Sequence, residues 1–189
     1  MTVKTLVDHF QVSATPIREA LVRLSQERLV NYHPNVGASV IELTDDDLRE
    51  IYEFVGDVDS LAIHYASMHP RNQELIEKLR ENLRRSRELM GVENAEEWNA
   101  CTDAFHMLFF EYCRNSRLTE AADGVRSQLA IMSNQCGKYI ELQEQICRFH
   151  ELIFKAYENG EIERAMQLMR QHLRDSLVEE QHLLNMEEK

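Results

Sequence analysis

Residues 12–30 read VSATPIREALVRLSQERLV, and this stretch decides how the first part of the chain folds. Pro16 suits the first turn of a helix, because the amide hydrogen that proline lacks would have no partner there. Ser13 or Thr15 can cap that turn with a side-chain oxygen. Apolar residues then recur at helical spacing: Ile17, Ala20, Leu21 and Leu24. The stretch therefore predicts a helix over 15–27.

A short amphipathic segment over 3–10 precedes this helix, and the break at 11–13 separates the two. Two short helices joined by a tight break are typical of a helix-turn-helix. Directly afterwards, residues 29–43 (LVNYHPNVGASVIEL) place two β-rich runs about a turn that holds Pro34, Asn35 and Gly37, which predicts a hairpin. A small hairpin in this position is a wing. We place this partial winged-helix DNA-binding domain at residues 1–42.

The remaining residues, 43–189, show helical periodicity throughout and form the second predicted domain. Turn signals divide this part into six helices, near 45–68, 71–89, 94–114, 117–136, 140–158 and 161–186, the first with an interruption expected at Gly56. Helices of this length joined by short turns pack as an antiparallel bundle. The predicted fold class is all-α: an antiparallel helical bundle preceded by a partial winged helix-turn-helix with a small β-hairpin wing.

Composition excludes several other classes of protein. The 189 residues include only 6 Gly and 3 Pro, too few turn residues for an all-β chain. Nowhere do 18 apolar residues run together, and the polar N-terminus does not suit a secretory peptide. The four cysteines form no Cys-x-x-Cys pair, so we expect reduced, mostly buried thiols and a cytoplasmic protein without a membrane partner. The four cysteines are Cys101, Cys113, Cys136 and Cys147.

The charge is distributed unevenly along the chain. Residues 1–41 carry a net charge of +1, whereas residues 42–189 carry −13. An acidic body repels polyanions. Any contact with nucleic acid must therefore come from the first forty residues, or from a dimer that presents two copies of them.

Three histidines, His106, His150 and His172, fall on apolar helix faces. The turn at 159–160 folds the last two helices antiparallel, and His150 and His172 lie about 15 and 18 Å of helix rise from it, so their rings reach similar heights. Taken singly, each is more often a core histidine bonded to a neighbour than a ligand. Their spacing nevertheless allows them to meet.

Asp103 lies one turn before His106, on the same helical face. A carboxylate with three neutral imidazoles suits a divalent metal and leaves coordination positions open for water or a ligand. We therefore predict a site for Zn²⁺ or Ni²⁺, with Mn²⁺ as a further possibility, built from Asp103 and the three histidines. Arg126 is a candidate for contact with an anion inside the bundle, and a solvated surface arginine is the alternative.

Residues 12–30, followed by NVGASV at 35–40, resemble the recognition helix and wing of GntR-family transcription regulators. Three further segments resemble the C-terminal ligand-binding domain of the FadR subfamily, called FCD. They are LTDDDLREIYEFVGDVDSLAIHYAS (43–67), TDAFHMLFFEYCRNSRL (102–118) and FHELIFKAYENGEIERAMQLMRQHL (149–173). The resemblance covers essentially the whole chain.

This resemblance implies a homodimeric, metabolite-responsive DNA-binding regulator. Its helical domain would bind a small carboxylate effector through a metal held by one acidic residue and three histidines. The histidines carry over to His106, His150 and His172, and Arg126 would bind the effector. The residues implied in DNA contact are Lys4, Ser13, Thr15, Arg18 and Gly37.

The chain departs from the family pattern at several positions. The family's acidic ligand lies four residues before the first histidine, where this chain has Thr102, so either Asp103 substitutes or the site has three protein ligands and more water. Ala14 replaces an arginine that follows the serine, and Asp59 replaces a glutamate. The helix that precedes the helix-turn-helix would lie before Met1, which implies a truncated fold and weakened DNA binding.

Two other functions remain open at this point. One is a helical metalloenzyme, a hydrolase or lyase with Asp103 as base. No nucleophile motif or phosphate-binding glycine loop accompanies it in the sequence. The other is a truncated regulator that has lost DNA binding and acts by pairing with full-length partners.

Overall fold

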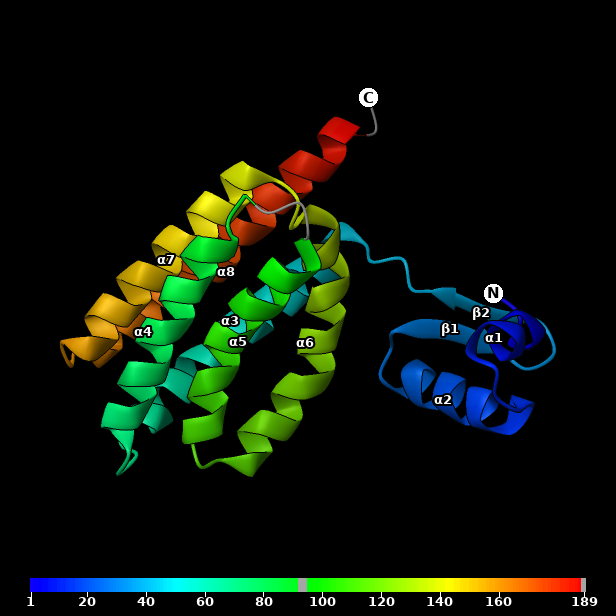
Figure 1. Cartoon of the computed structure of the whole chain (residues 1–189), viewed down its shortest axis with the longest axis horizontal. Helices are drawn as coiled ribbons and strands as arrows, with labels where there is room; N and C mark the ends of the chain where they lie inside the picture. Colours follow the sequence, from blue (N-terminus) through cyan, green and yellow to red (C-terminus); the bar gives the residue numbers. More distant parts are fainter. Residues whose placement is uncertain (92–94, 188–189) are drawn as a thin grey trace. The chain divides into compact units, whose positions relative to one another are not determined.

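The computed structural model describes residues 1–91 and 95–187, and the chain divides into two compact units, Met1–Asp46 and Asp47–Lys189. Helices form most of the chain, and a two-stranded hairpin is the one sheet among the described residues (Figure 1). The predicted fold class, a helical bundle preceded by a small winged helix-turn-helix, is confirmed.

The N-terminal unit contains α1 (Val3–Phe10), α2 (Ala14–Gln26), β1 (Val30–His33) and β2 (Gly37–Val40). The strands are antiparallel, and Val30 pairs with Val40. Apolar side chains from all four elements form one small core: Val3, Leu6, Val7, Ile17, Leu21, Val30, Tyr32 and Ala38. The apolar residues that recur at helical spacing in α1 and α2 therefore pack against the apolar residues of the two strands.

The cap of α2 differs from the sequence expectation. Ser13 occupies the N-cap position, but its side chain makes no capping hydrogen bond, and Thr15 lies inside the helix. A serine cap commonly bonds the amide of the third helical residue, which here is Pro16 and has no amide hydrogen. Thr2 does cap α1, because its hydroxyl accepts from the Thr5 amide at 3.1 Å.

The helical unit is built from six helices. They are α3 (Asp45–Ser67), α4 (Asn72–Leu89), α5 (Ala95–Tyr112), α6 (Ser116–Cys136), α7 (Ile140–Glu158) and α8 (Ile162–Glu187). These bounds agree closely with the turn signals in the sequence. Residue 94, where we expected the third of these helices to begin, lies outside the described residues.

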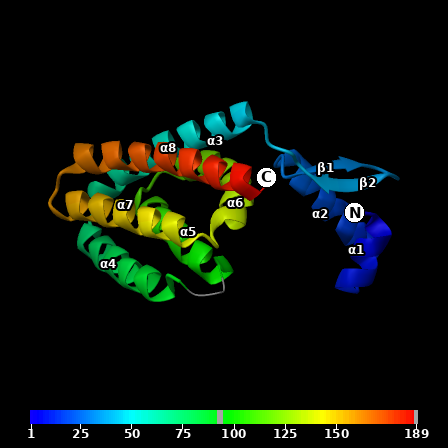
Figure 2. The ribbon, with the colours of Figure 1, turned by 90° about the horizontal axis from the view of Figure 1, so that it is seen from above.

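The helices pack in an antiparallel arrangement. Figures 1 and 2 show α7 and α8 side by side along their length, and α4 packs against both α5 and α7. The interruption expected at Gly56 does not occur, since α3 is continuous there. A β-carbon on Gly56 would lie 3.5 Å from Cβ of Leu173, an ordinary van der Waals contact, so this position faces α8.

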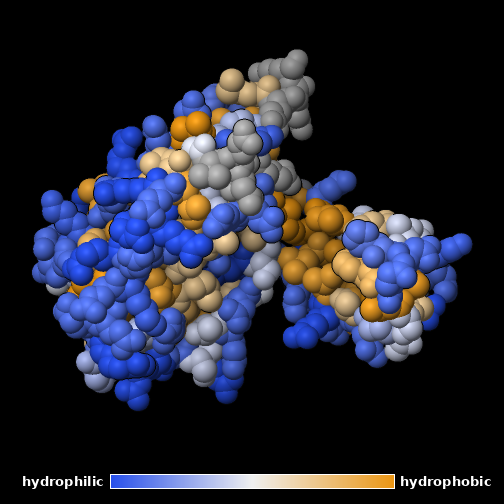
Figure 3. Space-filling model, in the orientation of Figure 1, coloured by the Kyte–Doolittle hydropathy of each residue, from blue (hydrophilic) through white to orange (hydrophobic). Residues whose placement is uncertain are grey.

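The surface over α4 is hydrophilic in the space-filling view (Figure 3). Its arginines form ion pairs with neighbouring helices, such as Arg80 with Glu158 on α7 and Arg85 with Glu97 on α5. The four cysteines are free and buried, as predicted. No helix in the described part of the chain is both long enough and apolar enough to span a membrane.

Candidate metal centre

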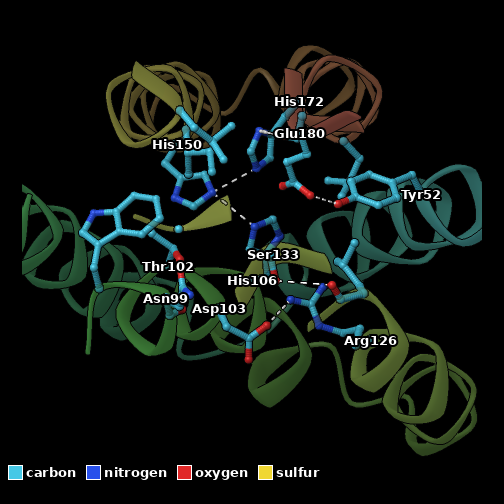
Figure 4. Close-up of a pocket in the computed structure, with 17 residues that line it drawn as sticks. Tyr52, Asn99, Thr102, Asp103, His106, Arg126, Ser133, His150, His172 and Glu180 are labelled. Carbon is cyan, nitrogen blue, oxygen red and sulfur yellow. Dashed lines mark hydrogen bonds and ion pairs between the residues drawn. The ribbon is translucent and has the colours of Figure 1, made fainter. Parts of the chain in front are cut away.

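Three helices of the bundle bring three histidine side chains to one point. His106 comes from α5, His150 from α7 and His172 from α8, and all three are buried. Nε2 of His150 lies 3.1 Å from Nε2 of His106 and 3.1 Å from Nε2 of His172. Figure 4 shows these rings converging on a cavity inside the helical unit. The predicted meeting of the three histidines is present in the structure.

The Asp59 carboxylate fixes the orientation of His106. Its Oδ2 lies 2.7 Å from Nδ1 of His106, and Asp59 is buried. Burial alone would raise the pKa of Asp59, but the charge of Arg126 and the bond to His106 outweigh burial and lower this pKa. The ionised carboxylate accepts a hydrogen bond from Nδ1–H, which leaves the lone pair of His106 Nε2 facing the other histidines.

Arg126 of α6 is also buried and holds Asp59 from the other side. Its Nη1 donates to both carboxylate oxygens of Asp59, at 2.9 and 2.7 Å, and its Nη2 donates to Asp103. The guanidinium lines the cavity, as expected for an anion-binding group. In this structure, however, two carboxylates of the chain itself already occupy it.

Asp103 does not join the three histidines. Its side chain is 60% exposed and pairs with Arg126, and the group of converging ligand atoms consists of the histidines alone among the described residues. The reason lies in the helix geometry: one residue is a rotation of about 100°, so Asp103 and Thr102 cannot face the same point. Thr102 is the buried member of this pair, and its hydroxyl donates to the backbone carbonyl of Asn99.

His150 and His172 are neutral in this environment. Burial and the neighbouring histidines lower the pKa of both well below the usual range. Nδ1 of His172 lies 3.4 Å from the Ser176 hydroxyl, whereas Nδ1 of His150 has no partner among the described residues. The ring of His150 stacks on Phe105 at 4.1 Å between centroids. Neutral imidazoles with converging lone pairs are the form that binds metal ions.

Two of the three separations between the nitrogens match those of ligands on one metal ion, and all three nitrogens lie within 4.8 Å of one another. With bonds of about 2.1 Å, two imidazole nitrogens on one ion lie about 3.0–3.4 Å apart for octahedral to tetrahedral angles. The two separations of 3.1 Å fall in this range. Without a cation, three nitrogen atoms would face one another with too few protons to pair them all.

A second polar pair lines the same cavity and was missed by the sequence analysis. The Tyr52 hydroxyl of α3 donates to Oε2 of Glu180 on α8, and both residues are buried. Burial raises the pKa of Glu180 to about 7. The sequence does contain a signal, because Glu180 continues the buried stripe of His172 and Ser176 at four-residue steps along α8.

Family comparisons agree with this architecture. The family model described as the FCD domain matches residues 50–175, and the model described as bacterial regulatory proteins of the gntR family matches residues 1–40. The chain belongs to the FCD-domain regulators of the GntR family. All three histidines and Arg126 lie within the FCD match.

Individual relatives support the same assignment. The HTH-type transcriptional regulator YdhC of Bacillus subtilis (strain 168) is 27% identical over 183 residues, which cover 95% of this chain and 80% of YdhC. The HTH-type transcriptional repressor RspR of Escherichia coli (strain K12) is 20% identical over 166 residues, covering 88% of this chain and 72% of RspR.

Solved structures share the fold. E. coli McbR/YncC superposes with a TM-score of 0.84 at 18% identity, covering 97% of this chain and 87% of that chain. A GntR regulator from Rhodococcus sp. RHA1 gives a TM-score of 0.79 at 20% identity, covering 96% and 86%. This FCD-domain regulator is therefore a DNA-binding transcription regulator, and the metalloenzyme alternative is set aside.

The residues expected to contact DNA lie in the GntR match, and four of them are exposed: Lys4, Ser13, Thr15 and Arg18. Gly37 has a positive φ of 138°, and a β-carbon there would lie 2.4 Å from the carbonyl oxygen of Met1. Glycine is therefore required at position 37 by the chain's own backbone, independently of any contact with DNA.

Proposed function

We propose that the helical unit of this regulator binds a small carboxylate effector through a divalent metal held by His106, His150 and His172. The observation that carries the proposal is the convergence of three Nε2 atoms, with His106 oriented by Asp59. Such a carboxylate partner on the outer nitrogen of a metal-binding histidine raises its basicity and fixes its tautomer.

The charge balance of the cavity supports a bound cation. Three carboxyl groups lie in or directly behind its wall, those of Asp59, Asp103 and Glu180, and Arg126 is the one guanidinium among the described lining residues. Neutral histidines add nothing to this balance. With all three carboxyl groups ionised, a carboxylate effector would meet a net negative cavity, and a divalent ion neutralises that charge.

The donor set favours Zn²⁺ or Ni²⁺. Imidazole nitrogen suits these ions, whereas Mn²⁺ prefers carboxylate oxygen, and Asp103 lies outside the converging group. Three protein ligands leave coordination positions open. When bound, the metal would supply a Lewis-acidic anchor for a carboxylate oxygen of the effector.

Arg126 has a second role in this proposal. Asp103 occupies its Nη2, yet the Asp103 side chain is 60% exposed and is free to rotate towards solvent. An effector carboxylate can then replace the Asp103 carboxylate on the guanidinium, so Arg126 still pairs with two carboxylates. Arg126 thereby contributes to effector binding while its Nη1 continues to hold Asp59.

We further propose that the regulator acts as a homodimer, because paired DNA half-sites mirror the two-fold symmetry of a dimer. Lys4, Ser13, Thr15 and Arg18 would make the DNA contacts, since they lie exposed on or beside α1 and α2. Residues 1–41, which hold these side chains, carry a net charge of +1, in contrast to −13 over residues 42–189.

Metal titration of the full chain tests the metal site. Isothermal titration with zinc chloride should show one site per chain, and His172→Gln should weaken binding at least 100-fold, because it removes one of three ligands. His182→Gln is the matched control, since His182 is exposed on the same helix.

The effector step is tested on the zinc-loaded protein. Acetate should raise the melting temperature of the zinc-loaded chain and leave that of the metal-free chain unchanged, because a ligand stabilises the state that binds it. Equal zinc binding by the wild type and His172→Gln, or equal acetate stabilisation with and without zinc, would contradict the proposal.

A further inference from the structure

The cavity has a second polar level, two helical turns away from the metal centre. Seven or eight residues of an α-helix rise about 10–12 Å, close to two turns, so residues at this spacing share a face. On each of four helices, a polar residue lies seven or eight positions from a residue of the metal centre or its hydrogen-bond network. Tyr52 precedes Asp59 on α3, Asn99 precedes His106 on α5, Ser133 follows Arg126 on α6, and Glu180 follows His172 on α8.

The hydroxyl groups at this level have already donated their protons. Tyr52 donates to Glu180, Ser133 donates to the carbonyl of Leu129 at 3.3 Å, and Thr102 donates to the carbonyl of Asn99 at 2.9 Å. A hydroxyl that has donated its one proton presents only lone pairs to other groups. These three side chains therefore offer acceptors to the cavity.

Two further donors lie in the wall. The hydroxyl of Ser176 lies 3.4 Å from Nδ1 of His172, whereas the indole N–H of Trp98 is buried without a hydrogen-bond partner among the described residues. The oxygen acceptors of the second level therefore outnumber this one open donor.

Glu180 is the strongest of these acceptors. It is 2% exposed, and among the described residues its carboxylate has one hydrogen-bond partner, the Tyr52 hydroxyl on Oε2. Figure 4 shows Glu180 beside His172, with its carboxylate in the cavity. The tyrosine bond occupies Oε2, so a ligand in the cavity that supplies an O–H or N–H group can donate to the carboxylate at Oε1.

We infer that Glu180, supported by Tyr52, selects effectors that carry a hydroxyl or ammonium group in addition to the carboxylate. The effector then spans the cavity: its carboxylate lies at the histidine level and its donor group lies at Glu180. This inference rests on the proposed function, since it takes the carboxylate anchor from there. It adds the chemical class of the ligand, a small hydroxy or amino acid.

The dimensions of the cavity restrict the effector to a short chain. The cavity volume is about 80 Å³. The two levels are separated by about 10–12 Å of helix rise, and the side chains and the metal take up part of that span at both ends. Acids of three or four carbons with the donor group on the last carbon match this geometry.

Two matched series of acids test the inference on the zinc-loaded full chain. One series is propionate, 3-hydroxypropionate and 3-aminopropionate, and the other is butyrate, 4-hydroxybutyrate and 4-aminobutyrate. The four-carbon series is the stricter test, because its terminal groups could chelate the metal only through a seven-membered ring, whereas the three-carbon acids can form a six-membered chelate. Titrations at pH 8 keep Glu180 ionised, because burial raises its pKa to about 7.

At least one substituted acid should bind tenfold or more tightly than its unsubstituted parent. A preference for the amino acid identifies an ammonium ligand, and a preference for the hydroxy acid identifies a hydroxyl ligand. Equal or tighter binding of both parent acids would overturn the inference even if Glu180 variants could not be prepared.

Glu180→Gln provides the test at the residue level. The amide oxygen can still accept from Tyr52, but the amide N–H₂ then turns a donor towards the cavity. The preference for the substituted acid should fall at least fivefold, while binding of the parent acid changes less than twofold. Glu163→Gln, at an exposed glutamate of the same helix, should change neither value.

The outcomes separate the inference from the proposed function. If zinc and the parent acids bind but no substituted acid is preferred, or if Glu180→Gln leaves the preference unchanged, the inference is wrong and the metal-anchored carboxylate site stands. If the chain binds no zinc, the proposed function fails first. If zinc binds and none of the six acids does, both the anchor and the inferred class are contradicted.

Discussion

Nδ1 of His106 lies 2.7 Å from Oδ2 of Asp59, which is 47 residues earlier in the chain. This bond ties α3 to α5 and turns the free nitrogen of His106 towards His150 and His172. Arg126 holds the same carboxylate from the opposite side. A buried chain of Arg126, Asp59 and His106 therefore connects the cavity wall to the proposed metal ligands.

The first prediction concerns Asp59. Asp59→Asn should weaken zinc binding about 10–100-fold, the effect typical of losing the outer partner of a metal-binding histidine. The measurement is competition with a chromophoric chelator at pH 7.5. Asp57→Asn is the control, because Asp57 is exposed and pairs with Arg170 on the surface. Unchanged zinc affinity in Asp59→Asn would show that His106 needs no such partner.

The second prediction separates two roles of Asp103. If this residue were a metal ligand, Asp103→Asn would weaken zinc binding strongly. The structure instead predicts a change of less than threefold, because Asp103 pairs with Arg126 and lies outside the histidine group. Acetate should bind the zinc-loaded variant several times more tightly, since Nη2 of Arg126 is released. Loss of zinc together with unimproved acetate binding would restore Asp103 as a ligand.

The third prediction is a pH dependence of stability. The folded-state pKa of Glu180 is about 7 against an ordinary value of 4.5. A raised folded-state pKa means that the contribution of Glu180 to the unfolding free energy is fully present below pH 4.5 and is lost as the pH rises through 7. The shift corresponds to about 3 kcal/mol as an order of magnitude.

Urea unfolding of the wild type and Glu180→Gln at several pH values checks this effect. The difference in unfolding free energy between the two proteins should move in favour of the glutamine variant from pH 4.5 to pH 8. The other titrating groups cancel in this difference. A constant difference across the range would mean that Glu180 titrates in the folded protein as it does in water.

The fourth prediction concerns DNA. Arg18 is exposed on α2, and Arg18→Ala should weaken binding to a short random-sequence duplex and reduce the salt dependence of log K by about 1. Fluorescence anisotropy at several salt concentrations gives both values. Arg164→Ala, at an exposed arginine of α8, is the control. Equal salt slopes for the two variants would remove Arg18 from the DNA interface.

Most of the fold follows from local sequence signals. The helix-turn-helix, the hairpin about Asn35 and Gly37, and the bounds of the six bundle helices were predictable because caps, turn residues and periodicity agree locally. The missing capping hydrogen bond of Ser13 was not predicted, because it depends on which residue occupies the third helical position. The continuity of α3 at Gly56 was not predictable either, because a single glycine only weakens a helix and the packed bundle around it is a long-range feature.

The site was predictable in part. The three histidines could be grouped because a turn at 159–160 sets two of them at one height and apolar faces point all three inward. For the fourth position the sequence left two alternatives, Asp103 or water, and the pairing of Asp103 with Arg126 favours the second. Asp59 and Glu180 both lie in buried stripes of their helices, and their partners are 47 and 128 residues away in sequence.

X-ray absorption spectroscopy of the zinc-loaded full chain identifies the ligands of the bound ion. Binding by His106, His150 and His172 gives three imidazole nitrogens at about 2.0–2.1 Å, one or two further oxygen ligands and no sulfur. Addition of a carboxylate effector should change the oxygen ligands and preserve the three imidazoles. A zinc ion bound by fewer than three imidazoles, or by any of the cysteine thiols, would contradict the account.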